Sequence, residues 1–244
     1  MGCQCSNSRI ELNKEQSLYH ENISNKTKDL KILNGSNSNI TNDNINDSNF
    51  SREFKKNTNQ NSNYLIYKLF EYINKIRTNP MSMIDKIEKS KSRIFEKDNK
   101  ILFDCGNNVY SLLNKGISSF DDCIKLLLTQ KILEPIELNN DLKIEFDLEN
   151  NSKEDFTSFH FISQILKQKF EDIKNKYNVI GFHYDICSDN PEISSILQLV
   201  DDTGNNFSRK KNILNPKAKY VGISFVYIKT NIICYYLLFG NKKN

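Results

Sequence analysis

The sequence lacks several of the patterns from which an enzyme class can be read directly. Its 244 residues contain only eight glycines. Gly204 and Gly222 are isolated, so no glycine-rich loop is available to cradle a phosphate group. No Gly-x-Ser-x-Gly elbow and no catalytic cysteine motif occur. Local motifs therefore give no support to a nucleotide-binding enzyme or to a nucleophile-based hydrolase.

Long apolar stretches are missing as well. The N-terminal segment has no apolar core of the kind found in secretory signal peptides, and no run of about eighteen apolar residues could cross a bilayer. Cys105, Cys123, Cys187 and Cys234 show no Cys-x-x-Cys pairing. We therefore expect a reducing compartment, in which these side chains are small buried hydrophobic groups rather than disulfides or zinc ligands.

A strong charge of one sign is also absent. The chain has 34 Lys and Arg residues against 30 Asp and Glu residues, which gives a formal net charge of +4. No basic stripe interleaved with aromatic residues occurs, and nucleic-acid-binding proteins commonly carry one. We therefore expect no nucleic-acid partner.

The most informative residues that are present open the chain, as Met1-Gly2-Cys3-Gln4-Cys5-Ser6. Gly2 followed by Ser6 fits the N-myristoylation pattern, and Cys3 and Cys5 are candidate palmitoylation sites beside it. One myristoyl chain binds membranes only marginally, with an association constant of roughly 10⁴ M⁻¹, so stable anchoring needs a second acyl chain. We expect membrane lipid to be a partner through these acyl chains, on the cytoplasmic face of a plasma or ciliary membrane.

Apolar residues are unevenly distributed along the chain. They make up 38% of it, below the roughly 45–50% of globular proteins, and the deficit lies in residues 1–63. This segment is rich in asparagine, with Asn37, Asn39, Asn42, Asn44, Asn46 and Asn49 close together. It cannot bury enough apolar surface to offset the entropy of ordering. The sequence predicts a disordered tether over 1–63 and one domain over 64–240.

Apolar spacing and turn residues predict the elements of that domain. Helices are expected from a cap at Ser62-Asn63 to Arg77, from Pro80 through Ile87, from Ser119 to before Pro135, over 141–149, over about 157–176, and from Asn190-Pro191 to Asp201. Extended segments are expected at 101–103, 179–187, 219–228 and 232–239, with turns at 105–108 and 229–231.

The last extended segment decides the predicted fold class. Along 232–239, Ile233, Tyr235, Leu237 and Phe239 alternate with Ile232, Cys234, Tyr236 and Leu238. Both faces are apolar, so this strand should be covered on both sides. With helices in front and behind, the sequence predicts an α+β fold, a three-layer α-β-α sandwich with a central antiparallel sheet, preceded by the disordered tail.

Several strings, taken in order, resemble the CAP superfamily of cysteine-rich secretory, antigen and pathogenesis-related proteins, in the form of a divergent protist-type member with an SCP-like domain. Residues 70–80, which contain Arg77, Asn79 and Pro80, resemble the family's first helix and the break after it. Residues 196–202 resemble a helix ending in paired acids, Asp201 and Asp202. Residues 209–216, with Arg209 and Asn212, resemble its His-Arg-x-Asn-Ile string, and residues 219–224, with Gly222, resemble the strand that follows. The resemblance implies a CAP-like sandwich over about 64–240 and a possible apolar groove for lipid or sterol.

Departures from the family pattern bear on function. Members often carry two histidines and two acids around a cleft, sometimes with a divalent metal, yet Arg209 stands where one histidine is expected. An arginine neither gives up its proton nor binds a cation. The acid-bearing string of the family is replaced near His183-Tyr184-Asp185-Ile186. We expect no metal and no cofactor.

The remaining polar residues have simpler interpretations. His160 and His183 are expected to be surface or hydrogen-bonded histidines. Asp201 and Asp202 are expected to end a helix, where the dipole disfavours them, so each should have a hydrogen-bond partner. Residues 208–211 are expected to form a solvated loop, with contact to anionic lipid as the alternative.

Three hypotheses of function follow from the sequence. The leading one is a non-enzymatic, membrane-tethered CAP-like module that binds a protein or lipid ligand or acts as a scaffold, with no catalytic residue. The second is a metal-assisted hydrolase using His160 or His183 with nearby acids. The third is a degenerate domain with a structural role in a cilium or cortex.

Overall fold

The computed structural model describes residues 47–147, 158–202, 208–229 and 231–243. The predicted acylation sites Gly2, Cys3 and Cys5 and most of the predicted tether lie outside these residues, as does the isolated Gly204. Within the described residues the helices are α2 (Asp47–Thr78), η1 (Pro80–Met83), α3 (Ile84–Ser90), η2 (Lys91–Arg93), α4 (Ile117–Thr129), η3 (Asn140–Leu142), α5 (Phe159–Ile173), α6 (Pro191–Val200) and α7 (Ser208–Ile213). The strands are β1 (Ile94–Lys97), β2 (Lys100–Gly106), β3 (Val109–Leu113), β4 (Glu137–Leu138), β5 (Tyr177–Ser188), β6 (Tyr220–Lys229) and β7 (Ile232–Lys242).

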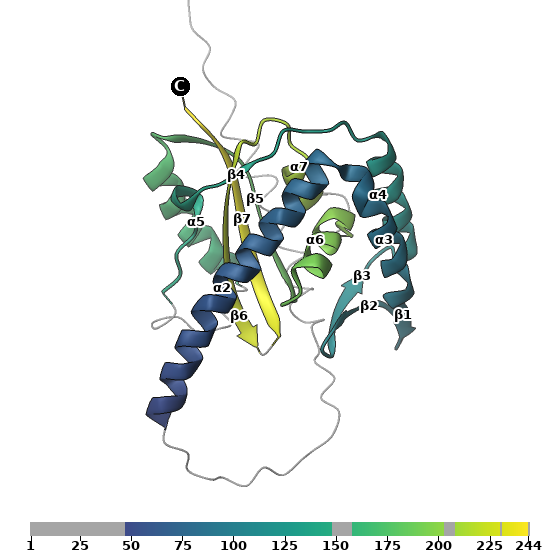
Figure 1. Ribbon diagram of the computed structural model, residues 1–244, viewed down its shortest axis with the longest axis horizontal. Coiled ribbons are helices and arrows are strands. Elements are labelled where there is room, and N and C mark those ends of the chain that lie inside the picture. Colours follow the sequence, from purple (N-terminus) through teal and green to yellow (C-terminus); the bar gives the residue numbers. More distant parts are fainter. Residues whose placement is uncertain (1–46, 148–157, 203–207, 230, 244) are drawn as a thin grey trace, which may run out of the picture.

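The strands form two separate sheets, as Figure 1 shows. The larger sheet has the order β4-β6-β7-β5, in which β6, β7 and β5 are antiparallel and the short β4 runs parallel to β6. The smaller sheet is the antiparallel meander β1-β2-β3. The predicted α+β class is confirmed, and so is the antiparallel hairpin at the centre of the main sheet.

The two apolar faces of β7 are buried on opposite sides of the sheet, as its alternation predicts. Ile233, Tyr235, Leu237 and Phe239 belong to the large core cluster, whereas Cys234 and Tyr236 belong to a second cluster and Leu238 to a third. All residues from Ile232 to Gly240 are buried. This is the burial expected of a strand with no solvent-facing side.

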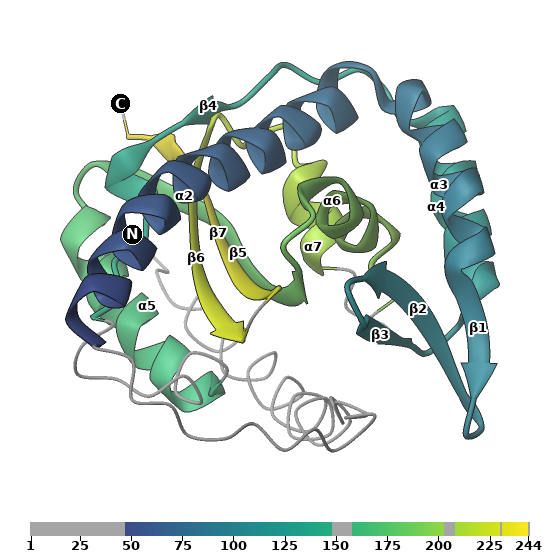
Figure 2. The same ribbon diagram turned by 60° about the horizontal axis from the view of Figure 1, so that its bottom comes forward.

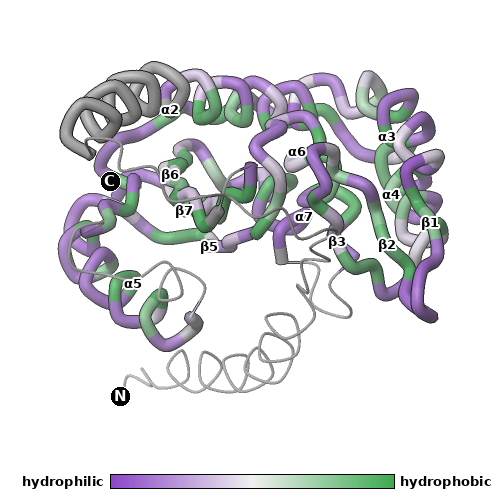
Figure 3. The backbone as a smooth tube through the Cα atoms, turned by 90° about the horizontal axis from the view of Figure 1, so that it is seen from below, coloured by the Kyte–Doolittle hydropathy of each residue, from purple (hydrophilic) through white to green (hydrophobic). Residues whose placement is uncertain are grey.

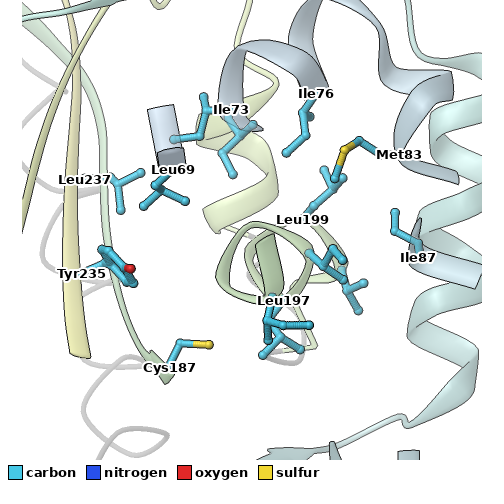
Figure 4. Packing of buried hydrophobic residues seen from close by; sticks show 14 of the residues in the cluster. Leu69, Ile73, Ile76, Met83, Ile87, Cys187, Leu197, Leu199, Tyr235 and Leu237 are labelled. Carbon is cyan, nitrogen blue, oxygen red and sulfur yellow. The ribbon is translucent and has the colours of Figure 1, made fainter. Parts of the chain in front are cut away.

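Helices lie on both faces of the main sheet (Figure 2). On one face, side chains of α2 and α6 belong with those of β7 to the large cluster. Figure 4 shows Leu69 beside the strand that carries Tyr235, Leu197 on α6, and Ile87 of the same cluster on the far side of α6. On the other face, Ile162 of α5 packs with Tyr236. The four cysteines that the structure describes are buried and free, as predicted.

The first described helix is longer than predicted. α2 begins at Asp47, not at the Ser62-Asn63 cap, so residues 47–63 of the predicted tether are helical in the structure. A helix already nucleated by its packed half adds each further residue at little cost. Composition alone did not reveal this extension, because the added residues bring few apolar groups.

The predicted helix over 141–149 is wrong. Only the short η3 turn forms. Lys143, which follows it, is extended, and residues 143–147 belong to no helix or strand. Leu142 and Ile144 are buried, and Phe146 packs on Tyr236 with ring centroids 4.5 Å apart. These three apolar residues alternate with polar ones, which is the period of a strand rather than of a helix. Residues 148 and 149 lie outside the described residues.

The remaining element predictions agree with the structure to within a few residues, except that residue 230 of the turn predicted at 229–231 lies outside the described residues. The strand predicted at 101–103 is the centre of β2, and the turn predicted at 105–108 joins β2 to β3, with Asn107 and Asn108 at φ 53° and 59°. The β1–β2 hairpin was not predicted. Its turn uses Asp98 and Asn99 at φ 52° and 58°, a left-handed geometry that Asn and Asp tolerate well.

Candidate functional site

Several of the polar residues singled out in the sequence lie where α6 and α7 pack against β5, among them His183, Arg209 and Asn212. Asn190 caps α6, its side chain accepting from the backbone N–H groups of Glu192 and Ile193, and Pro191 is the first helical residue. Every residue of α6 from Ile193 to Val200 is buried. The predicted start of this helix is confirmed, and its burial means that any polar side chain on it must find an internal partner.

His183 of β5 is the centre of this arrangement. Its side chain is buried, with Nε2 lying 3.2 Å from Gln198 Oε1 and Nδ1 lying 3.3 Å from Asn212 Nδ2. The Asn212 amide also donates to the carbonyl of Phe182 at 3.1 Å, which fixes its orientation. Gln198 donates to Ser194 Oγ at 3.2 Å. The histidine therefore accepts at Nδ1 and donates from Nε2, so both ring nitrogens are engaged by amide side chains.

The pKa of His183 is lowered to about 4, first by burial and then by the positive charge of Arg209. A neutral imidazole is consequently the stable form at physiological pH. The expectation of a hydrogen-bonded histidine is confirmed for this residue. His160 is exposed on α5 and lies 3.0 Å from Gln164, so the two histidines belong to different parts of the molecule.

Arg209 forms an ion pair with Asp185, with Nη2 2.8 Å from Oδ1. Only 14% of the arginine side chain and 8% of the aspartate side chain are exposed. The prediction that residues 208–211 form a solvated loop is therefore wrong, because they begin α7 and bring Arg209 onto β5. The arginine offers only hydrogen-bond donors, and its positive charge compensates the buried carboxylate of Asp185.

Asp201 and Asp202, at the end of α6, accept hydrogen bonds from backbone N–H groups of neighbouring segments. Asp201 has φ 51°, and its carboxylate accepts from the N–H of Lys210 at 3.2 Å. Asp202 accepts from the N–H of Lys115 at 2.8 Å, and its carbonyl accepts from Asn114 Nδ2 at 2.6 Å. The expected hydrogen-bond partners are confirmed. Asp201 thereby lies at the start of α7, where a negative charge is favourable.

Two glycines permit the close approaches on which this packing depends. A Cβ atom at Gly181 would lie 2.0 Å from Asn212 Oδ1, and one at Gly222 would lie 2.1 Å from the carbonyl carbon of Leu142. Gly222 is one of the positions on which the resemblance to the CAP superfamily was based. Gly181 was missed, although an isolated glycine within a predicted strand is a signal of close approach.

Arg77 belongs to a different arrangement, at the far end of α7. It is completely buried and donates from Nε to the carbonyl of Glu134, from Nη1 to those of Ile213 and Asn215, and from Nη2 to that of Ala218, over 2.7 to 3.1 Å. Burial lowers its pKa from the ordinary value. The guanidinium thus joins α2 to two loops. Asn79 is exposed and Pro80 begins η1, so neither reaches the His183 centre.

A surface cleft of about 480 Å³ lies where the start of α6 faces α2. Glu192 accepts from Tyr72 Oη at 2.5 Å and from Lys86 Nζ at 2.6 Å. Burial and the Glu192 hydrogen bond raise the pKa of Tyr72, and the carboxyl pKa of Glu192 is lowered despite its partial burial. Sequence reasoning missed this cluster, because its members lie on three separate helices.

The described part of the chain holds no group of three His, Cys, Asp or Glu side chains placed to share a metal ion. No helix within it is both long and apolar enough to span a bilayer. In comparisons with known proteins, no family model, no curated protein and no solved structure matches the chain.

Proposed function

We propose that this chain is a non-enzymatic binding or scaffold module with a CAP-type three-layer sandwich, held on the cytoplasmic face of a membrane by N-terminal acyl chains. The fold part of the proposal is supported by the helices on both faces of the main sheet (Figure 2) and by the order of the matching strings along it. Arg209 and Asn212, from one of these strings, contact β5, and Gly222, from the next string, lies on β6 in close contact with Leu142.

The non-enzymatic part of the proposal rests on His183, whose two ring nitrogens both have hydrogen-bond partners inside the domain. A general base needs a free ring nitrogen within reach of a substrate proton, and both nitrogens of this buried ring are already bonded to Gln198 and Asn212. The adjacent Arg209 is paired with Asp185. The residues that a hydrolase would use hold α6, α7 and β5 together instead.

The residues do not fit the divalent metal found in some relatives of the CAP type. Arg209 occupies the expected histidine position and offers only donors, and its partner Asp185 is neutralised by it. We therefore propose no metal-assisted step. Elemental analysis of the purified protein should give far less than one metal ion per chain, and stoichiometric zinc would overturn the non-enzymatic proposal.

The membrane part rests on Gly2, Cys3 and Cys5, whose spacing suits acylation by two different fatty acids. The acyl chains would supply the membrane partner, and the domain would present its surface to a protein or lipid ligand. Because one acyl chain binds only weakly, the proposal requires that loss of Gly2 acylation releases the protein.

Fractionation of cells expressing tagged protein tests this part. Wild-type protein should sediment with membranes, Gly2→Ala should be soluble, and a Cys3→Ser/Cys5→Ser double variant should bind only partly. Asn7→Ala, which leaves the acylation pattern intact, is the matched control and should sediment like wild type. Mass spectrometry that finds an unmodified Met1 on the native protein would contradict the proposal.

A further inference from the structure

The surface cleft between α2 and the start of α6 combines aromatic and charged side chains. Tyr64, Lys68 and Tyr72 line it from α2 at intervals of four residues, so they form one stripe along that helix. The neighbouring stripe, which includes Leu65 and Leu69, is buried in the large core cluster. In Figure 3, α2 alternates between hydrophilic and hydrophobic segments where it passes α6. The helix therefore gives one stripe to the core and the other to the cleft.

The cleft has the size of a site for a small organic molecule. Its volume of about 480 Å³ falls within the roughly 300–1,000 Å³ of such sites. The side chain of Tyr64 is 55% exposed, so much of its ring contacts water. A flat apolar group placed in the cleft would remove part of this aromatic surface from water.

The carboxylate that lines the cleft already has its partners. Glu192 accepts from Tyr72 Oη at 2.5 Å and from Lys86 Nζ at 2.6 Å. Lys68, which also lines the cleft, forms an ion pair with Glu71 at 2.6 Å. In each ion pair the two formal charges cancel, so neither leaves a charge uncompensated for a ligand.

Arg93 is the remaining charged residue of the cleft lining. Its side chain is exposed and donates from Nη1 to the carbonyl of Asp104 at 3.2 Å. Within residues 47–147, 158–202, 208–229 and 231–243, no carboxylate forms an ion pair with it. A guanidinium presents its N–H groups as a planar fork that matches a carboxylate. The bond to Asp104 holds Nη1 and leaves Nε and Nη2 to bind a ligand.

We infer that this cleft binds a small carboxylate ligand with a flat apolar body, in which Arg93 pairs with the carboxylate and Tyr64 covers the body. A single negative charge suits the cleft better than a doubly charged phosphate, because the carboxylate of Glu192 lies in the same cleft and repels each added charge. The inference rests on the proposed role as a binding module and names a ligand class for it. It does not involve the N-terminal acyl chains.

Titration of the isotope-labelled full chain with sodium benzoate, followed by nuclear magnetic resonance, tests the site. Benzoate combines a carboxylate with a flat apolar ring. The backbone amide signals of Arg93, Asn190, Glu192 and Ile193 should shift saturably, with a dissociation constant of roughly 1–10 mM, as expected of so small a ligand. Benzyl alcohol, which keeps the ring without the charge, should bind about tenfold more weakly. Inorganic phosphate at neutral pH should also bind more weakly than benzoate.

Variants of Arg93 and Tyr64 assign the two parts of the ligand to their partners. Arg93→Met should weaken benzoate binding roughly tenfold, because the charge-assisted pair is lost. Arg93→Lys keeps the charge but not the fork and should weaken binding about threefold. Tyr64→Ser should weaken it about threefold, because less apolar surface is buried with the ring.

The matched control is Lys125→Met, which makes the same change in net charge as Arg93→Met, on α4 at a side chain that is 76% exposed. It should bind benzoate like the parent. Thermal unfolding of Arg93→Met should match that of the parent, because this exposed side chain is no part of the core. A loss of binding in this variant then reports on the site and not on the fold.

Three results would overturn the inference. They are the absence of saturable shifts of these amides with benzoate, binding of benzyl alcohol or phosphate as tight as that of benzoate, and equal weakening by Lys125→Met and Arg93→Met. Failure of the proposed function appears separately, as stoichiometric zinc in the purified protein or an unmodified Met1 in the native one, and leaves the benzoate result unchanged.

Discussion

Arg77 offers the sharpest test of how this domain is held together. Replacing it with methionine keeps most of the side-chain volume but leaves the four carbonyls of Glu134, Ile213, Asn215 and Ala218 without their donor. Each buried carbonyl left unsatisfied costs about 1–3 kcal/mol, so the four together cost at least about 4 kcal/mol. Part of this is offset, because the guanidinium no longer has to be buried. We expect Arg77→Met to lower the free energy of unfolding by about 3 kcal/mol.

The conservative variant separates charge from geometry. Lysine keeps the positive charge, but its single ammonium group has three donors and no planar fork. It cannot serve four carbonyls arranged around the arginine, so Arg77→Lys should still cost about 2 kcal/mol. Arg93→Met is the control: Arg93 is exposed and donates to the carbonyl of Asp104. This surface change should stay within about 0.5 kcal/mol of wild type.

Urea denaturation and thermal melting of the full chain measure these differences. For a domain of this size, about 1 kcal/mol shifts the melting temperature by roughly 2–4 °C, so Arg77→Met should melt roughly 6–12 °C lower. If Arg77→Lys were as stable as wild type, charge alone would suffice and the fork argument would be wrong. If Arg77→Met were also neutral, the carbonyls would not depend on this side chain.

Three other predictions concern the His183 centre. Because the pKa of His183 is lowered to about 4 from 6.5, the unfolded chain takes up a proton first as the pH falls. Urea denaturation should therefore show that the free energy of unfolding of wild type falls by about 3 kcal/mol as the pH is lowered from 6.5 to 4. His183→Gln should lack this loss, and parallel pH profiles of the two proteins would contradict the prediction. Gly181→Ala should cost about 2 kcal/mol, because its Cβ overlaps the Asn212 amide, and it should cost less in an Asn212→Ala background; additive costs in the double-mutant cycle would refute the overlap. Asp185→Asn should lower the free energy of unfolding by about 3–5 kcal/mol, because the buried Arg209 loses its ion-pair partner. Asp185→Leu/Arg209→Met, which removes both charges, should recover much of that stability. If the double variant were no more stable than the single one, the broken ion pair would not be the cause.

The predictions that came from the sequence were accurate where one local signal dominated. The unbroken apolar alternation of β7 predicts burial on both sides, and Asn190 followed by Pro191 predicts the start of α6; both are found. Such signals are local, because side-chain period and capping geometry act within a few residues.

The errors arose where the outcome depends on distant contacts. Ile144 lies outside any helix, and its N–H donates to Ser224 Oγ, of a residue eighty positions away. Arg209 looked like part of a solvated loop because its partner Asp185 lies on a strand that precedes it by a whole helix. The Tyr72–Glu192–Lys86 cluster was not predicted either, because its residues are also far apart in the sequence. The sequence pattern therefore predicts helices and strands more accurately than it predicts which of them pack against one another.

The position of β7 has a consequence for how this protein is made. This strand pairs with β5 on one side and β6 on the other, yet it follows every other described element along the chain. A ribosome therefore delivers the middle of the main sheet after both of its neighbouring strands. Until β7 emerges, β5 and β6 share no partner strand, and the helices on the two faces of the sheet lack the side chains of β7 to pack against, so the sheet cannot assemble before β7 is synthesised.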